Sequence, residues 1–103
     1  MSEDFKLPNN CTNMAEVRIG VDQTDRELME LLERRFGYMR AAARIKPNRN
    51  VVRDEARKAE VIENARADAE RRSLPAQELA QIWDDLVEMS IAYELEEWDR
   101  IRT

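Results

Sequence analysis

The apolar residues of this chain recur at intervals of three and four, the spacing that places side chains on one buried face of an α-helix. The first such stretch lies before Pro47 and contains Met14, Val17, Val21, Leu28, Leu31, Leu32, Met39, Ala42 and Ile45. Thr12 or Asn13 can cap its start, and with Asn13 as the cap Glu16 completes a capping box. Proline disfavours a helical conformation in the residue before it, so the pattern predicts one helix over residues 13–46, roughly 50 Å long.

Two shorter helices follow in the pattern. Residues 47–50 (PNRN) form a turn, and a second helix is predicted from about Val52 to Arg72. SLP at residues 73–75 interrupts the pattern, and proline suits a first helical turn, so a third helix is predicted from about Pro75 to Arg102. No segment shows the alternation typical of a strand. The chain is therefore predicted to be all-α, with three helices.

The length of the first helix has a consequence for assembly. A compact domain of this size has a radius of gyration near 13 Å, so it cannot cover a stripe of roughly 50 Å. We expect a second copy to cover the rest, giving an intertwined homodimer. Gly20 and Gly37 lie inside this helix and indicate either tolerated flexibility or close approach of another helix. Residues 1–12 are predicted to be a flexible arm before a helical domain over residues 13–103.

Composition narrows the class of protein. The net charge is -5, which argues against a general nucleic-acid binder. No run approaches the roughly 20 apolar residues of a membrane span, and the polar start MSEDFKLPNN is not a signal peptide. We therefore expect a cytoplasmic protein. The chain has no histidine, so chemistry depends on Arg, Lys, Asp, Glu and hydroxyl groups.

Four polar residues occupy positions at which the helical pattern predicts apolar side chains. Arg35 and Lys46 continue the seam of the first helix, with directions about 20° apart and positions about 16 Å apart along it. Ser90 and Glu94 continue the stripe of the third helix, one turn apart. Any one of them alone is more often a side chain that reaches solvent. Several unpaired buried charges are costly, so together they indicate a polar pocket for an anion.

Arg18 and a group on the second helix extend this hypothesis. Arg18 precedes Arg35 by about 25 Å along the axis and points about 100° away, so the two cannot hold one small ligand within a chain. If Arg18 serves a pocket, that pocket belongs to another copy. Asp54, Arg57 and Lys58 fall within about one turn of each other on the second helix.

The ordered motifs CTNMAEVRIGVDQTD, RRFGYMRAAARIK, VRDEARK and SIAYE resemble the all-helical chorismate mutase family, including the related isochorismate pyruvate lyases. The resemblance covers about residues 11–98. The first two motifs are most similar to the lyase branch, whereas Asp54 and Ser90 are more similar to true mutases. The resemblance implies an intertwined dimer of three-helix chains with two equivalent sites.

The resemblance also implies a role for each candidate residue. Arg35 and Arg57 would hold one substrate carboxylate, and Arg18 of the partner chain would hold the other. Lys46 and Glu94 would flank the ether oxygen. Because a carboxylate there would repel the negative charge that develops on this oxygen, we expect Glu94 to act in its protonated form, so that activity falls as pH rises. Asp54 and Ser90 would lie near the ring hydroxyl and the ring carboxylate respectively.

Two residues depart from the family pattern. Bacterial mutases usually carry Gln in place of Glu94, and many mutases carry Glu in place of Lys58, where the acid contacts the ring hydroxyl. The implied reaction is the rearrangement of chorismate, a dicarboxylate, to prephenate without a cofactor or a metal. The alternatives are cleavage of isochorismate to salicylate and pyruvate, and a non-catalytic helical dimer.

Overall fold

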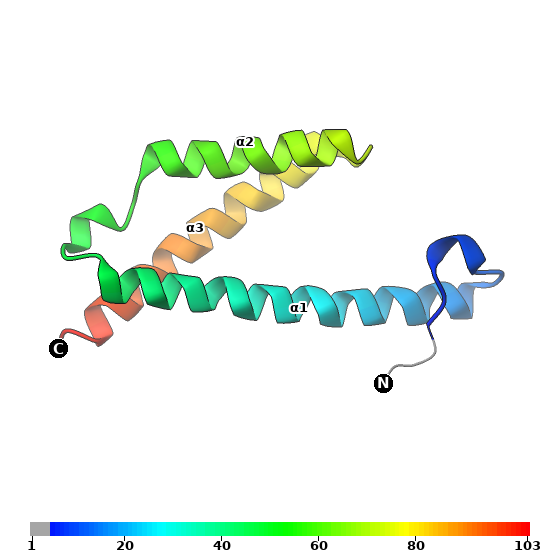
Figure 1. The fold of residues 1–103 in the computed structure, drawn as a ribbon, viewed down its shortest axis with the longest axis horizontal. Coiled ribbons are helices and arrows are strands. Elements are labelled where there is room, and N and C mark those ends of the chain that lie inside the picture. Colours follow the sequence, from blue (N-terminus) through cyan, green and yellow to red (C-terminus); the bar gives the residue numbers. More distant parts are fainter. Residues whose placement is uncertain (1–4) are drawn as a thin grey trace. The chain divides into compact units, whose positions relative to one another are not determined.

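The computed structural model describes residues 5–103, and within them it contains three α-helices, two short 3-10 helices and no strand (Figure 1). The all-α prediction is confirmed. In chain order the elements are η1 Pro8–Asn10, α1 Met14–Ile45, η2 Arg49–Val51, α2 Glu55–Arg71 and α3 Ala76–Arg100. The chain separates into two compact units, Met1–Arg35 and Phe36–Thr103. The division into an arm and a helical domain stays a prediction, and residues 1–4 of that arm lie outside the described part.

In the first unit, local hydrogen bonds fix the start of α1. The Glu16 amide donates to Asn13 Oδ1 at 2.9 Å, as predicted for an Asn13 cap. The Glu16 carboxylate accepts from the amide of Thr12 at 2.8 Å, so the reciprocal bond reaches one residue further back than a capping box requires. Lys6 also pairs with Glu16 at 2.8 Å. These bonds, that from Lys6 first, lower the pKa of Glu16 to about 2.

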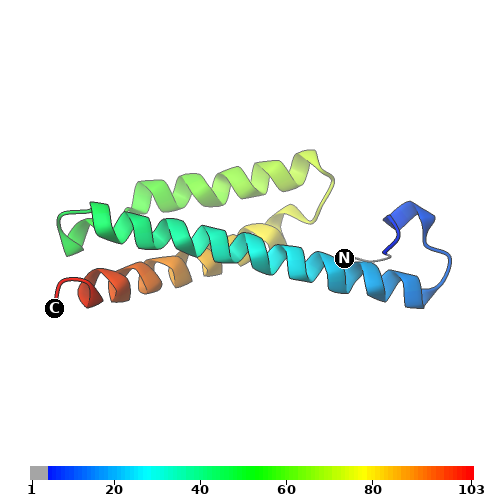
Figure 2. The same ribbon diagram turned by 60° about the horizontal axis from the view of Figure 1, so that its bottom comes forward.

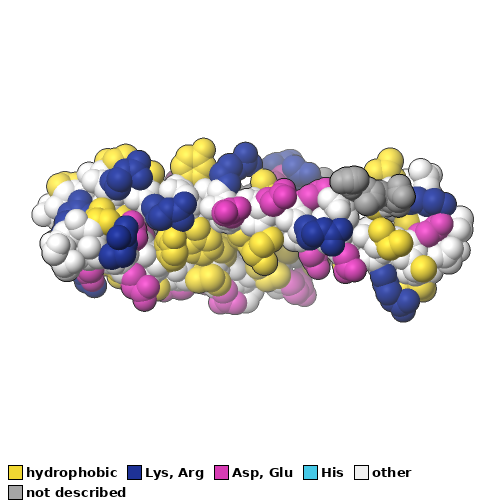
Figure 3. All heavy atoms as spheres, turned by 90° about the horizontal axis from the view of Figure 1, so that it is seen from below, with side chains coloured by type: hydrophobic (Ala, Val, Ile, Leu, Met, Phe, Trp, Pro, Cys, Tyr) yellow, Lys and Arg dark blue, Asp and Glu magenta, His cyan; other side chains and the backbone are white. Residues whose placement is uncertain are grey.

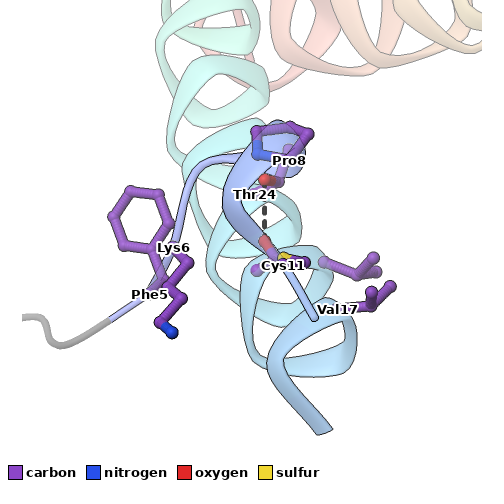
Figure 4. Close-up of a pocket in the computed structure, with 8 residues that line it drawn as sticks. Phe5, Lys6, Pro8, Cys11, Val17 and Thr24 are labelled. Atoms are coloured by element: carbon purple, nitrogen blue, oxygen red, sulfur yellow. Dashed lines mark hydrogen bonds between the residues drawn. The ribbon is translucent and has the colours of Figure 1, made fainter. Parts of the chain in front are cut away.

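The segment before α1 folds back on the helix, and together they line an open pocket of about 230 Å³. Figure 4 shows its lining, which includes Phe5, Lys6, Pro8, Cys11, Val17 and Thr24. The hydroxyl of Thr24 donates to the carbonyl of Gly20 at 2.8 Å. A Cβ on Gly20 would lie 3.7 Å from the Lys6 carbonyl oxygen, an ordinary contact. The backbone that approaches Gly20 in this unit is therefore the folded-back segment.

The start of α2 differs from the prediction. The helix begins at Glu55 rather than near Val52. Asp54 has an extended backbone, and its Oδ1 accepts from the Arg57 amide at 3.1 Å, which makes it the N-cap. An aspartate in this position satisfies one of the first free N–H groups and holds the preceding residue outside the helix. Val52 is consequently free to turn inward, where it is buried.

In the second unit, α2 packs along α3, and η2 also contacts α3 (Figures 1 and 2). The buried core consists of Val52, Val87 and Ile91, with Val61, Leu95 and Trp98 packed around it. The last turns of α1 contact α3 through Tyr93. Its ring meets Phe36 edge-on at 4.8 Å between centroids, and its hydroxyl accepts from Arg40 at 2.8 Å. This contact brings the end of α1 against α3.

Much of the apolar stripe of α1 remains exposed. Met14, Val21, Leu28 and Leu31 are each at least half exposed, at 56%, 52%, 50% and 50%. Figure 3 shows hydrophobic side chains at the surface among charged ones on this face. None of the described helices is both long enough and apolar enough to cross a bilayer. These four residues of the predicted stripe are thus not covered within the first unit.

Candidate active site

The centre of the candidate site is an ion pair between α1 and α3. Lys46 Nζ lies 2.8 Å from Glu94 Oε2. The Glu94 side chain is only 5% exposed and that of Lys46 is 29% exposed. The same Oε2 accepts no hydrogen bond of normal geometry. The two charges are therefore close, but the ammonium is not oriented to donate to this oxygen. A buried oxygen with an ill-directed partner has unused capacity for a donor or a ligand.

Local structure fixes the position of Lys46. α1 ends at Ile45, and the Lys46 amide still donates to the Ala42 carbonyl at 2.9 Å. Lys46 Nζ donates to the carbonyl of Val52 at 3.1 Å. That carbonyl is available because the chain has left α1 and has not yet entered α2. The ammonium is therefore held between a backbone dipole and the Glu94 carboxylate.

Ser90 lies one turn before Glu94 on the same face of α3. Both residues are buried, at 3% and 4% exposure. The Ser90 hydroxyl donates to the Leu86 carbonyl at 2.7 Å, a bond within the helix. The prediction that Ser90 and Glu94 are at least partly buried is therefore confirmed. The roles of these residues stay predictions.

The three candidates on α2 have different partners. Asp54 is exposed and caps the helix. Arg57 is exposed and pairs with Glu60 on its own helix at 2.8 Å. Lys58 is turned toward α3, where it pairs with Glu88 and with Asp84, the latter at 3.3 Å. The described contacts therefore link Lys58 to α3 through acids that lie outside the Lys46–Glu94 pair.

Glu88 is an ionised acid that the sequence analysis did not identify. Arg53 grips it with two nitrogens, Nη1 at 3.0 Å and Nη2 at 2.7 Å, and Lys58 donates to it as well. These bonds, Arg53 first, lower the pKa of Glu88 to about 2. The bond that Lys58 donates to Glu88 is also the main cause of the raised pKa of Lys58. Spacing along one helix could not reveal this cluster, because its members lie on different elements.

A pH prediction follows from Glu88. The pKa of Glu88 is lower in the folded protein than the ordinary 4.5 of the free side chain. Its ionised carboxylate therefore contributes fully to the free energy of unfolding above pH 4.5, and this contribution is lost as pH falls toward 2. We expect the thermal unfolding midpoint to fall over this range. In Glu88→Gln the fall should be smaller than in wild type and in the exposed control Glu96→Gln. Identical slopes in all three proteins would show that the cluster does not form in solution.

Arg18 and Arg35 lie in the first unit, both on α1. Arg18 is exposed, and Arg35 is half-buried. Both are therefore on the helix that presents the exposed apolar stripe.

Comparison with known proteins identifies the family of the chain. The profile of the family described as chorismate mutase type II matches residues 17–95, which span parts of all three helices. The chain is similar to isochorismate pyruvate lyase from Pseudomonas aeruginosa PAO1, with 27% identity over 98 residues. That match covers 95% of this chain and 97% of the relative. The protein belongs to the chorismate mutase type II family.

Proposed function

We propose that the protein is an enzyme that rearranges chorismate to prephenate. The observation that carries this proposal is the buried Lys46–Glu94 ion pair beside Ser90 in a member of this family. In the rearrangement the ether C–O bond breaks as a C–C bond forms, and no group is added or removed. The protein needs only to hold a compact conformation and to stabilise charge that develops on the ether oxygen.

In this proposal substrate binding separates the Lys46–Glu94 pair, Glu94 takes up a proton, and the ether oxygen lies between the two side chains. The Lys46 ammonium supplies a fixed positive charge, and a protonated Glu94 supplies a hydrogen bond. Ser90, buried one turn away, lies beside the ring carboxylate. Asp54 uses Oδ1 to cap α2, which leaves Oδ2 to accept from the ring hydroxyl. Lys58 forms ion pairs with acids of α3. Because Glu88 is one of these acids, its negative charge offsets the positive charge of Lys58 near the substrate ring.

The substrate carboxylates require arginines. Arg57 is exposed at the start of α2, and Arg35 lies on the seam of α1; both are proposed to bind one carboxylate, since a guanidinium matches it in two parallel bonds. Arg18 is proposed to bind the other carboxylate in the partner chain of a homodimer. The exposed stripe of α1, with Leu28 and Leu31 half exposed, supports this assembly, because a second copy would cover it.

A second candidate is the cleavage of isochorismate to salicylate and pyruvate. The similarity to a lyase over nearly the full length of both chains favours it. It breaks the same kind of ether bond with the same cationic grip, but it also moves a ring hydrogen to the departing pyruvate. The rearrangement needs no such hydrogen transfer, since fixed charge and hydrogen bonds from the site are sufficient for it.

The test is turnover of each substrate by purified protein. Chorismate should give prephenate, identified by proton NMR. Salicylate and pyruvate from isochorismate, with chorismate unchanged, would replace the first candidate by the second. If neither substrate is consumed, the chain is a non-catalytic helical protein and both candidates fail.

The assembly is tested by sedimentation velocity. We expect a dimer at micromolar concentration, because the α1 stripe would otherwise expose several large apolar side chains. A folded monomer at this concentration would exclude both the dimer and a role for Arg18 in a partner's site.

Glu94→Gln tests the hydrogen bond to the ether oxygen. The amide keeps the shape of Glu94 and always carries a donor, so turnover at neutral pH should be equal to or above that of wild type. Glu96→Gln, on the exposed side of the same helix, is the matched control. Loss of turnover in Glu94→Gln alone would contradict a donor role for Glu94.

A further inference from the structure

The C-terminal end of α1 receives hydrogen bonds from side chains near the end of the chain. The last carbonyls of a helix have no partner within it, and Pro47 offers no N–H to continue the pattern. Trp98 Nε1 donates to the Lys46 carbonyl at 3.0 Å, and Arg102 Nη2 donates to the same oxygen at 3.0 Å. Arg102 Nη1 donates to the Ala43 carbonyl, also at 3.0 Å. Two side chains thus cap one helix end.

Trp98 and Arg102 support each other, and together they are called the C-terminal clamp. The Arg102 guanidinium lies 4.1 Å from the centre of the Trp98 ring, the geometry of a cation–π contact. Its positive charge also faces the negative end of the α1 dipole. Trp98 packs in turn against the core residues Val52, Val87 and Ile91. The clamp therefore ties the end of α1 to the most buried part of the second unit.

The clamped carbonyl belongs to Lys46 itself. Its amide is held by Ala42 and its carbonyl by the clamp, so the direction of its Cα–Cβ bond is fixed from both sides. We propose that Trp98 and Arg102 are positioning residues, which aim the Lys46 ammonium at the reacting end of the site. This inference rests on the proposed function for its catalytic consequence. Among the described contacts neither clamp residue touches the Lys46 ammonium, so their effect must pass through its backbone.

Trp98→Phe is the most selective test. Phenylalanine keeps an aromatic ring against the core and under Arg102, but it removes the N–H donor. A small displacement of a catalytic group can lower turnover steeply, so we expect kcat to fall by roughly 10- to 100-fold. KM should change by less than about threefold, because the carboxylate-binding arginines are untouched. Arg102→Ala should act in the same direction, and Arg100→Ala, which loses only its pair with Glu97, should not.

A double-mutant cycle separates positioning from general stability. If the clamp acts through Lys46, adding Trp98→Phe to a protein that already carries Lys46→Ala should lower kcat by no more than about twofold. An equal fall in both backgrounds would show that Trp98 supports the fold alone, and the proposal would be overturned. Measurements are made well below the unfolding midpoint of each variant.

A second readout does not depend on catalysis. Lys46 is paired and half-buried, so acetic anhydride should label it slowly, as measured by peptide mass spectrometry. In Trp98→Phe and Arg102→Ala the labelling rate of Lys46 should rise severalfold, while that of Lys58, held by Glu88, stays constant. Unchanged labelling of Lys46 would overturn the clamp as a positioning device. If wild type turns over neither substrate, the proposed function fails, yet this measurement still decides whether the clamp aims Lys46.

Discussion

Replacement of Lys46 by alanine is expected to lower the turnover of chorismate by roughly 100- to 1,000-fold, the typical cost of losing one preorganised charge at a developing oxyanion. The structure adds a second effect. Glu94 is almost fully buried, and without Lys46 its charge has lost its nearest partner. Breaking a buried pair from one side is strongly destabilising, so the single variant should also unfold more readily.

The double variant Lys46→Ala/Glu94→Gln separates the two effects. It removes the unpaired charge, so its unfolding midpoint should return toward that of wild type, while its turnover should stay low. Lys6→Ala is the matched control, because it removes a lysine from an ion pair in the other unit. Near-normal turnover of Lys46→Ala would show that its ammonium serves only to pair with Glu94 and does not act on the substrate.

Arg18→Ala and Arg35→Ala should each be nearly inactive, yet a mixture of the two should regain activity. A heterodimer of these variants has two sites. One of them contains both intact arginines, because it takes Arg35 from the Arg18→Ala chain and Arg18 from the Arg35→Ala chain. Random exchange makes half of the dimers mixed, so about a quarter of all sites should work. The measurement is chorismate turnover after the two proteins have been mixed under conditions that allow subunit exchange.

The matched control uses both substitutions in one chain. When the Arg18→Ala/Arg35→Ala protein is exchanged with wild type, both sites of each heterodimer carry a defect, so turnover should fall below that of unmixed wild type. If the first mixture gains nothing while exchange is demonstrated by mass spectrometry, Arg18 does not act in a partner's site.

The helices could be predicted because their signals are local. The apolar spacing of α1 and its ends at Asn13 and Pro47 depend on neighbouring residues only. The start of α2 was predicted about three residues too early, because the apolar pattern does not register that Asp54 uses its side chain as a cap. Caps are decided by side-chain geometry, and the periodicity of apolar residues carries no information on it.

The centre of the candidate site could also be found from sequence, since Lys46, Ser90 and Glu94 interrupt otherwise apolar stripes. The groups that pair with such residues could not be found in this way. The Val52 carbonyl faces Lys46 only because η2 folds inward, and Glu88 reaches Lys58 only because α2 packs along α3. Trp98 and Arg102 lie more than fifty residues from the helix end that they cap. Such contacts between distant segments depend on tertiary packing.

A competition between chorismate and isochorismate tests the proposed activity. Chorismate and isochorismate are supplied in equal amounts to one sample of wild-type protein, and proton NMR follows prephenate and salicylate together. The ratio of initial rates equals the ratio of the two kcat/KM values and does not depend on the active fraction of enzyme. If the protein rearranges chorismate as proposed, prephenate should form faster than salicylate. Faster formation of salicylate and pyruvate, or consumption of neither substrate, would contradict it.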